Sequence, residues 1–263
     1  MPHVQANGVR LYYEEHGAGA PIVCVHGTST SAMVWRPAAI QDLAGRGRTI
    51  VYDRRGCTRS ERPDPYETSL EEHAEDAAAL LEALDATPAI VIGRSYGGQT
   101  AIELALRHPE AVRALVLLDA AALPLDDEAM AWAGKLRLAV EEAAKRDIDT
   151  VAEVFLRPIL GDEAWESFPE PLKAMVTENA PAILAELRGP WLDADADLAR
   201  IAAPTLLVAG KESPPAFRRI TERMAAAIPD ARVVLAEGGH LIDPGHPDVL
   251  GFVDRVLGTA AQS

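Results

Sequence analysis

Short, mostly apolar runs alternate with helical stretches along much of this chain of 263 residues, and this rhythm constrains the fold more than any other feature. Runs without regular polar alternation are typical of strands that are buried on both faces. Such strands form a parallel sheet between two layers of helices. The predicted strands of this type are 21–25, 48–52, 89–92, 111–118, 205–209 and 231–236. The predicted helices around them are 34–44, 69–85, 96–107, 215–228 and 247–257.

The strand rhythm stops in the middle third of the chain. From about residue 121 to residue 200 the apolar residues follow a helical period, and no core strand is predicted there. The sequence therefore predicts an α/β core made of residues 1–120 and 201–263, with residues 121–200 inserted as a helical lid. The core begins with a strand at 9–14, which follows the turn signal Asn7-Gly8.

The charge balance and the cysteine count exclude several classes of protein. A formal net charge of −15 and a pI of about 4.9 describe a surface that repels nucleic-acid phosphates and anionic lipid headgroups. No apolar stretch has the length of a membrane span, and residues 1–10 lack a secretory signal pattern. Cys24 and Cys57 are too few for a disulfide framework. We expect a cytoplasmic protein with free thiols and no nucleic-acid or membrane partner; a homodimer stays open.

A serine lies at a sharp transition between a predicted strand and a predicted helix. The segment Gly93-Arg94-Ser95-Tyr96-Gly97 matches the pattern Gly-x-Ser-x-Gly, which in this context presents a nucleophilic serine at the end of a sheet. The flanking residues must be small because the turn is tight. The start of the following helix also favours negative charge beside the serine. A chance match in a loop would not explain this setting, so Ser95 is the candidate nucleophile.

A histidine follows the last predicted strand, where it can reach the same edge of the sheet. His240 comes after two glycines and before the last predicted helix. It is the candidate general base, which would take the proton of Ser95 and return it to the leaving group. His26, Asp53 and His246 are interpreted as structural residues that organise loops or begin a helix.

These segments together resemble the α/β-hydrolase superfamily. The resemblance rests on His26-Gly27, on Tyr-Asp-Arg-Arg-Gly at 52–56 with Ser60, on the turn at Ser95, and on Gly239-His240. It covers almost all of the chain outside the lid. It implies a mostly parallel sheet with a helical lid, a catalytic triad and an oxyanion hole. In this fold the oxyanion hole is formed by backbone N–H groups, here of Thr28 and Tyr96.

The third member of the triad is left open between two acids. Many members of the superfamily carry it a few residues after the strand at 205–209, but in this chain Ser213 occupies that position. Haloalkane dehalogenases of one subgroup and, distantly, the zearalenone lactonases carry an acid at the end of the preceding strand, which here is Asp119. We assign Asp119 as the acid that orients His240, with Glu212 as the alternative. For Asp119 the structural alternative is a helix cap or loop anchor.

The substrate pocket is expected to be apolar. The candidate substrate-binding residues are Trp132 and Trp191 in the lid and Trp35 shortly after the predicted oxyanion loop. Lid aromatic residues serve equally well as the hydrophobic core of the lid itself.

These residues predict a serine hydrolase that cleaves a small hydrophobic carboxylic ester or lactone through an acyl-enzyme. Carbon–carbon hydrolysis and perhydrolysis use a similar triad and stay open, as does a slow-turnover, receptor-like ligand-binding protein of this fold. Haloalkane dehalogenation is disfavoured because it needs a carboxylate nucleophile. The sequence has no phosphate-binding Gly-x-x-x-x-Gly-Lys loop and no metal-ligand spacing, so we expect no cofactor and no metal.

Overall fold

The computed structural model describes residues 2–193 and 196–258. Residues 194–195 of the predicted lid and 259–263 of the predicted core lie outside the described residues. Eight strands form a single sheet in the order β1-β2-β4-β3-β5-β6-β7-β8. The β1–β2 and β2–β4 pairs are antiparallel and the other pairs are parallel. The strands are β1 His3–Ala6, β2 Val9–His16, β3 Pro21–Val25, β4 Arg48–Tyr52, β5 Ala89–Arg94, β6 Val112–Leu118, β7 Thr205–Gly210 and β8 Ala231–Ala236.

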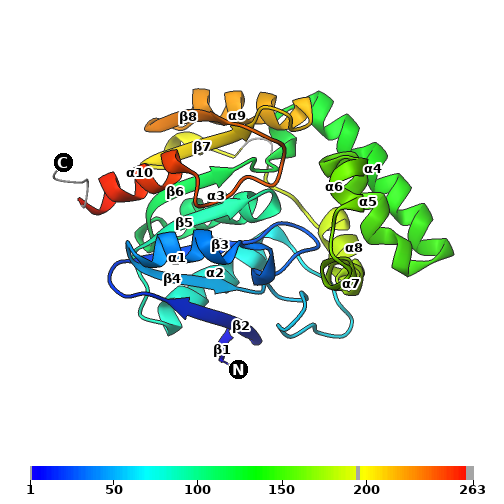
Figure 1. Ribbon diagram of the computed structural model, residues 1–263, viewed down its shortest axis with the longest axis horizontal. Coiled ribbons are helices and arrows are strands. Elements are labelled where there is room, and N and C mark those ends of the chain that lie inside the picture. The colour runs from blue at the N-terminus through cyan, green and yellow to red at the C-terminus, as the bar shows by residue number, and fades with distance from the viewer. Residues whose placement is uncertain (1, 194–195, 259–263) are drawn as a thin grey trace.

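The predicted α/β-hydrolase fold is confirmed, with helices covering both faces of the sheet (Figure 1). Along β3, Ile22 and Cys24 pack into the core beneath α1 and α10, whereas Val23 and Val25 pack into the core beneath α2, α3 and α9. A strand with both faces buried must be apolar throughout, which explains the continuous run. The five covering helices are α1 Pro37–Ala44, α2 Leu70–Ala83, α3 Tyr96–Arg107, α9 Pro215–Ala227 and α10 Pro247–Leu257.

Short local signals set the ends of several elements. Ser69 and Glu72 form the capping box that begins α2, since each side chain accepts a hydrogen bond from the backbone N–H of the other residue. The turn at Asn7-Gly8 joins β1 to β2, and both turn residues have a positive φ. The strand β1 was not predicted because it is only four residues long and Ala6 is its one buried residue.

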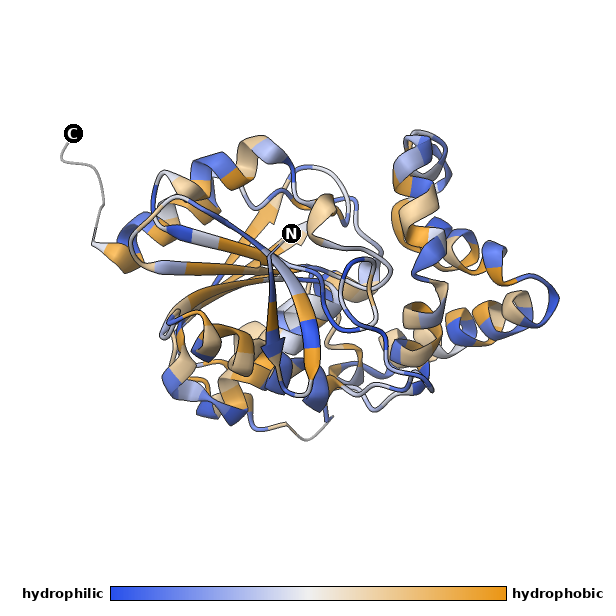
Figure 2. Cartoon of the chain, turned by 90° about the horizontal axis from the view of Figure 1, so that it is seen from below, coloured by the Kyte–Doolittle hydropathy of each residue, from blue (hydrophilic) through white to orange (hydrophobic). Residues whose placement is uncertain are grey.

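A helical insert separates β6 from β7 and gathers at one end of the sheet (Figures 1 and 2). Its α-helices are α4 Asp127–Arg146, α5 Val151–Leu160, α6 Asp162–Glu166, α7 Glu170–Glu178 and α8 Ala180–Arg188. Short 3-10 helices connect parts of the fold at Ala32–Val34, Pro109–Ala111, Leu123–Leu125, Ile148–Thr150 and Leu198–Arg200. Most buried apolar residues of the insert join the core beneath α2, α3 and α9.

A buried asparagine ties the insert to two loops at the carboxyl edge of the sheet. Asn179, between α7 and α8, donates hydrogen bonds from Nδ2 to the carbonyls of Ser29 and Thr30 at 3.0 and 3.2 Å. Its Oδ1 accepts the backbone N–H of Thr58 at 2.8 Å. Because Asn179 is fully buried, each of these bonds forms away from water, where an unpaired partner is costly.

A buried ion pair makes a second tie between the insert and the core. Arg54, which follows β4, lies 2.8 Å through Nη1 from Oε1 of Glu186 on α8, and both side chains are fully buried. Arg54 also donates from Nε to the carbonyl of His26 at 3.0 Å and from Nη2 to that of Gly27 at 3.1 Å. Burial lowers the pKa of this guanidinium, but Glu186 and neighbouring groups together raise it above its usual value, so Arg54 stays charged.

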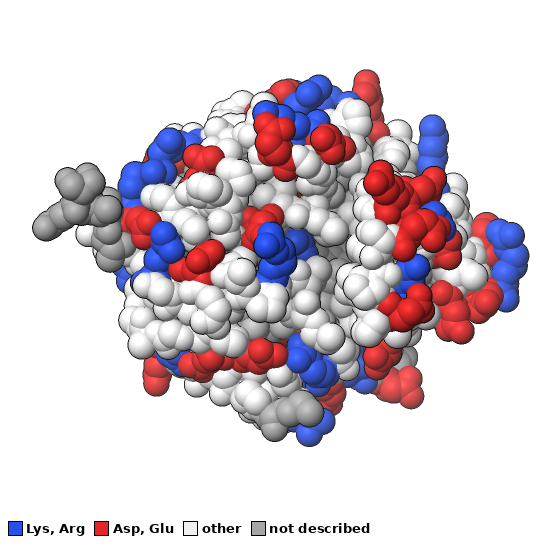
Figure 3. All heavy atoms as spheres, viewed as in Figure 1, with Lys and Arg blue, Asp and Glu red and all other residues white. Residues whose placement is uncertain are grey.

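Acidic and basic side chains are interspersed on the surface, and acidic ones are abundant over the helical insert (Figure 3). In the part of the chain that the structure describes, no helix is both long and apolar enough to cross a bilayer. Cys24 and Cys57 are free and buried, and burial raises the pKa of each thiol to about 12.

Candidate active site

Ser95 occupies the turn between β5 and α3 in a conformation that few non-glycine residues adopt. Its φ is 55° and its ψ is −120°. The surrounding backbone holds this turn: the Ser95 N–H donates to the carbonyl of Leu118 at 3.1 Å, and the Ser95 carbonyl accepts from Gly98 and Ala121 at 2.9 and 3.0 Å. Backbone strain of this kind is common where a side chain must be presented for function.

Close backbone contacts explain the glycines on both sides of Ser95. A Cβ atom on Gly97 would lie 2.2 Å from the carbonyl oxygen of Val25, and one on Gly93 would lie 2.3 Å from that of Gly97. Backbone cannot move aside as a flexible side chain can. The requirement for small residues at these two positions, which the sequence pattern implied, is therefore a packing requirement.

His240 lies in the loop between β8 and α10, and its ring contacts an acid at the end of β6. The distance from His240 Nδ1 to Asp119 Oδ2 is 3.3 Å, and both side chains are buried. Because a carboxylate can only accept, Nδ1 carries the proton in this contact and Nε2 is left as the acceptor. The ring of Phe217 on α9 packs against His240, with 4.3 Å between ring centroids.

Asp119 is fixed by three further groups. Its backbone N–H donates to the carbonyl of Val208 at 2.8 Å, and its Oδ1 accepts the backbone N–H of Gly210 at 3.2 Å. The hydroxyl of Ser213 donates a short hydrogen bond to Oδ2. Glu212, the alternative acid, is exposed and makes no side-chain hydrogen bond or ion pair with His240. The structure thus brings Asp119, and not Glu212, to the histidine.

Ser95 and His240 line the same small cavity. Its volume is about 30 Å³, and it lies under α5, which contributes Phe155 and Ile159 to its wall. Gly27 and Thr28 line it from the loop after β3. The backbone N–H of Tyr96 is at the start of α3, where the first amides of a helix lack partners within the helix. Of the two predicted oxyanion residues, Thr28 therefore borders the same space as the predicted nucleophile and base, and Tyr96 directly follows Ser95 at the start of α3.

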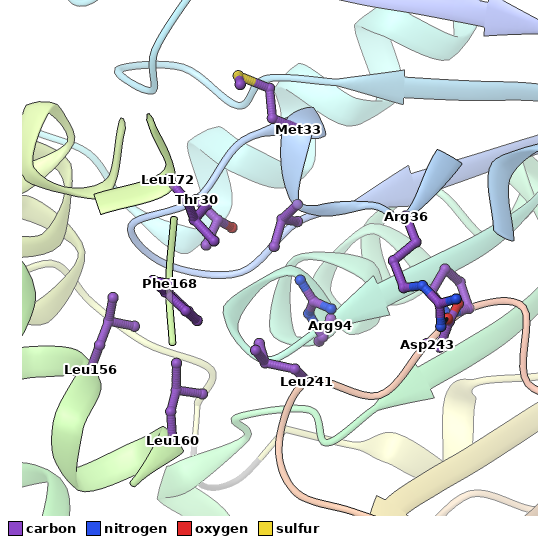
Figure 4. Close-up of a pocket in the computed structure, with 12 residues that line it drawn as sticks. Thr30, Met33, Arg36, Arg94, Leu156, Leu160, Phe168, Leu172, Leu241 and Asp243 are labelled. Carbon is purple, nitrogen blue, oxygen red and sulfur yellow. Dashed lines mark hydrogen bonds and ion pairs between the residues drawn. The ribbon is translucent and has the colours of Figure 1, made fainter. Parts of the chain in front are cut away.

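A larger cavity adjoins the first and shares Thr30, Arg94, Leu156, Leu160 and Leu241 with it. Its volume is about 210 Å³, so it offers more room for a substrate than the space beside Ser95. Its walls are mainly apolar. Figure 4 shows its labelled lining residues, which include Met33, Phe168 and Leu172.

The three tryptophans predicted to bind substrate do not line either of these two cavities. Trp35 is buried in the core beneath α1 and α10. Trp132 packs edge-on against Phe217, and Trp191 donates from Nε1 to the backbone carbonyl of Glu186 at 2.8 Å. The prediction is corrected here: Phe155 lines the smaller cavity and Phe168 the larger one, so the aromatic walls come from these two residues of the insert.

His26, Asp53 and His246, which were interpreted as structural residues, form hydrogen bonds or ion pairs with loops and with the start of a helix. His26 accepts the backbone N–H of Arg54 through Nε2 at 2.9 Å. Asp53 pairs with Arg59 at 2.7 Å, and His246 accepts a backbone N–H from the first turn of α10 at 3.3 Å. Burial lowers the pKa of His26 well below its usual value, so this ring is neutral.

Two residues near the site were missed. Arg94, the variable position before Ser95, lines both cavities, and Ser213 bonds the acid. The position of Ser213 in the sequence was noted, but its role was not. Among residues 2–193 and 196–258, no cluster of three or more His, Cys, Asp or Glu side chains could hold a metal ion.

Comparison with known proteins places this arrangement in a family. The sequence profile of the Alpha/beta hydrolase family matches residues 22–250, so the chain belongs to that family. It is 32% identical to the putative carbamate hydrolase RutD of Azorhizobium caulinodans, over 98% of this chain and 97% of that protein. It is also 32% identical to the 2-hydroxymuconate semialdehyde hydrolase of Pseudomonas sp. strain CF600, over 79% of this chain and 75% of that protein.

Among solved structures, a thermophilic esterase from Thermogutta terrifontis is similar over 99% of both chains, with a TM-score of 0.79 and 25% sequence identity. The names of these three proteins agree on hydrolysis and differ in the substrate that they state. The chain is accordingly a hydrolase of this fold.

Proposed function

We propose that this protein is a serine hydrolase that cleaves a carboxylic ester, open-chain or cyclic, through an acyl-enzyme. The observation that carries the proposal is the convergence of three side chains from separate elements. Ser95 on the β5–α3 turn and His240 line one cavity, and Asp119 contacts the far side of the histidine ring. This order of nucleophile, base and orienting acid is the arrangement that activates a serine hydroxyl.

In the proposed mechanism the Ser95 hydroxyl oxygen attacks the ester carbonyl carbon while His240 Nε2 takes the hydroxyl proton. The negative charge that develops on the carbonyl oxygen is held by the backbone N–H groups of Thr28 and Tyr96, each worth roughly 3–4 kcal/mol of the barrier. When the tetrahedral intermediate collapses, the C–O bond breaks and the alcohol leaves with the proton from His240. Water then repeats the sequence on the acyl-enzyme and releases the acid.

Asp119 has two tasks in this scheme. Its hydrogen bond keeps the proton of neutral His240 on Nδ1, so that Nε2 faces the serine as an acceptor. It also stabilises the positive charge that the ring gains in the transition state. The backbone and hydroxyl donors around Asp119 fix its position for both tasks.

The test is hydrolysis of p-nitrophenyl acetate and p-nitrophenyl butyrate by the wild type and three folded variants. We expect Ser95→Ala to lower kcat by at least about 10³-fold and Asp119→Asn by about 10³–10⁴-fold. Glu212→Gln, the matched acid outside the site, should leave kcat within about twofold. Full activity of Ser95→Ala would overturn the proposal.

The number of turnovers separates this proposal from a receptor-like ligand-binding protein. A hydrolase releases many equivalents of p-nitrophenol per chain, whereas a protein that only traps its ligand releases about one equivalent and stops. The similarity to 2-hydroxymuconate semialdehyde hydrolase favours carbon–carbon hydrolysis as the second candidate. Cleavage of a vinylogous diketone, with esters left intact, would establish that alternative.

A further inference from the structure

A buried positive charge that has no ion-pair partner among the described residues lies beside the proposed nucleophile. Arg94 immediately precedes Ser95, is only 5% exposed, and lines both cavities. Its Nη2 is buried and has no hydrogen-bond partner. An unsatisfied buried donor of a charged group is costly, and in a native protein such a group calls for an explanation.

The contacts of Arg94 within the protein satisfy only part of its guanidinium group. One face of the guanidinium lies over the ring of Trp35, 4.6 Å from its centroid. Nη1 reaches the backbone carbonyl of Ile242 at the long distance of 3.5 Å. These contacts hold the guanidinium in place and leave Nη2 unsatisfied.

The acid nearest to Arg94 is already engaged. Asp243 interacts electrostatically with Arg94, but its carboxylate pairs with Arg36 and accepts the backbone N–H of Gly245 at 2.9 Å. Among the described residues, Arg94 has no carboxylate within ion-pair distance. Burial lowers the pKa of Arg94 to about 10, which still leaves the guanidinium positively charged near neutral pH.

The rest of the larger cavity has a different character. Leu156 and Leu160 on α5, with Phe168 and Leu172, form an apolar wall. Figure 4 shows Arg94 in the middle of this lining, between Leu241 and the Arg36–Asp243 pair. Arg36 also lines this cavity, but its charge is paired with Asp243, so Arg94 supplies the one guanidinium of the lining that no carboxylate neutralises. A mainly apolar chamber with such a group suits a ligand with an apolar body and an anionic group, because the fork of donors matches a carboxylate.

We infer that Arg94 selects an ester that carries a carboxylate on the apolar arm occupying the larger cavity. The inference rests on the proposed function and specifies its substrate class. The carboxylate would accept from Nη2, while the hydrocarbon part of the arm would contact the leucines and Phe168. Arg94 is thus assigned a role in specificity and takes no part in proton transfer.

The test compares two matched pairs of esters that differ in charge. Mono-p-nitrophenyl adipate and p-nitrophenyl hexanoate have acyl chains of equal length, with the charge on the acyl side. The acetate ester of para-(hydroxymethyl)benzoate and benzyl acetate place the charge on the leaving-group side. The quantity measured is kcat/KM for the anionic ester divided by kcat/KM for its neutral partner, after subtraction of the spontaneous rate.

For at least one pair, we expect Arg94→Met to lower this ratio by about 10–100-fold, which is the value of a hydrogen bond to a charged group. The loss should appear mainly in KM. Arg94→Lys, which keeps a positive charge, should recover part of the ratio. Arg157→Met is the matched control, because it removes a partly buried arginine of α5 that does not line either cavity, and it should leave the ratio unchanged.

The outcomes separate the two proposals. If the wild type shows Ser95-dependent hydrolysis but Arg94→Met changes both members of each pair equally, Arg94 is a structural residue and the inference is wrong, while the proposed function stands. If the wild type hydrolyses none of the four esters, the proposed function fails, and the substrate class falls with it.

Discussion

At the scale of single residues, the acid that contacts His240 lies directly after β6 and not in the loop after β7. The loop after β7, where many relatives carry the acid, here holds Ser213. Its hydroxyl donates to Asp119 at the end of β6. In this chain the hydroxyl therefore supports the carboxylate that contacts the histidine. Asp119 also receives a backbone N–H from Gly210, so the hydroxyl is one of two fixed donors besides His240.

Ser213→Ala tests this positioning role. Removing one hydrogen bond to a buried carboxylate costs about 1.5–3 kcal/mol, because the oxygen loses a donor that water cannot replace. We expect kcat for p-nitrophenyl butyrate to fall by roughly 10–100-fold with little change in KM, and Ser213→Thr, which keeps the hydroxyl, to recover activity. Equal activity of the alanine variant and the wild type would show that the backbone donor alone positions Asp119.

The sequence predicted the nucleophile turn and the histidine because both are encoded locally. Close backbone contacts require glycine at Gly93 and Gly97, and this requirement can be recognised within the five-residue segment around Ser95. The sequence could not decide between Asp119 and Glu212, because the choice depends on which loops and strand ends lie close together in the folded protein. The tryptophans were wrongly predicted to line the pocket for a related reason. A helical period indicates that a residue is buried, but it does not indicate which part of the protein the residue packs against.

At the scale of elements, the strands β3 to β7 were predictable nearly to the residue, since burial on both faces imposes a continuous apolar run. The expectation of the same burial for 231–236 was wrong, because β8 is an edge strand on which Val233 and Leu235 are exposed. The helices of the insert were predictable only as a class. Their positions depend on buried polar contacts with distant loops, such as the ion pair between Arg54 and Glu186 and the bonds of Asn179. Polar partners separated by more than a hundred residues leave no periodic signal in the sequence.

The ion pair between Arg54 and Glu186 makes a stability prediction for the insert. Glu186→Gln leaves a buried guanidinium without its counter-charge, and breaking a buried pair in this way costs about 3–5 kcal/mol. We expect a lower midpoint in urea unfolding, by an amount that corresponds to this range. The matched control is Glu141→Gln, whose carboxylate lies 3.7 Å from the exposed Arg188 on α8 and should contribute under about 1 kcal/mol. Equal effects of the two variants would contradict the prediction.

At the scale of the whole molecule, two buried neutral histidines connect stability to pH. Burial and the nearby Arg54 lower the pKa of both His26 and His73 well below the usual value of 6.5. In the unfolded chain these rings take up protons below that value, whereas in the folded protein they do not. The unfolded state therefore binds more protons, and the stability that is present above pH 6.5 falls as the solution becomes more acidic.

We expect the free energy of unfolding to fall between about pH 7.5 and about pH 5.5, with each histidine contributing up to roughly 1.4 kcal/mol per pH unit. Urea unfolding at both pH values measures the slope. His73→Gln removes one of the two rings and should make the slope shallower. A slope that is the same in the variant and the wild type would show that His73 does not contribute.

The two ties of the insert also have a consequence for protein engineering. Asn179 lies just before α8 and Glu186 lies within it, seven positions later, and together they contact the loops that follow β3 and β4. The helices α4 to α6 make neither of these buried polar contacts. A chimera that carries a relative's helices on this core should therefore keep the native residues of α8 and Asn179, so that both buried contacts are retained. The exchange can then be confined to residues 127–166, which would change the walls of the cavities and leave the contacts between α8 and the core unaltered.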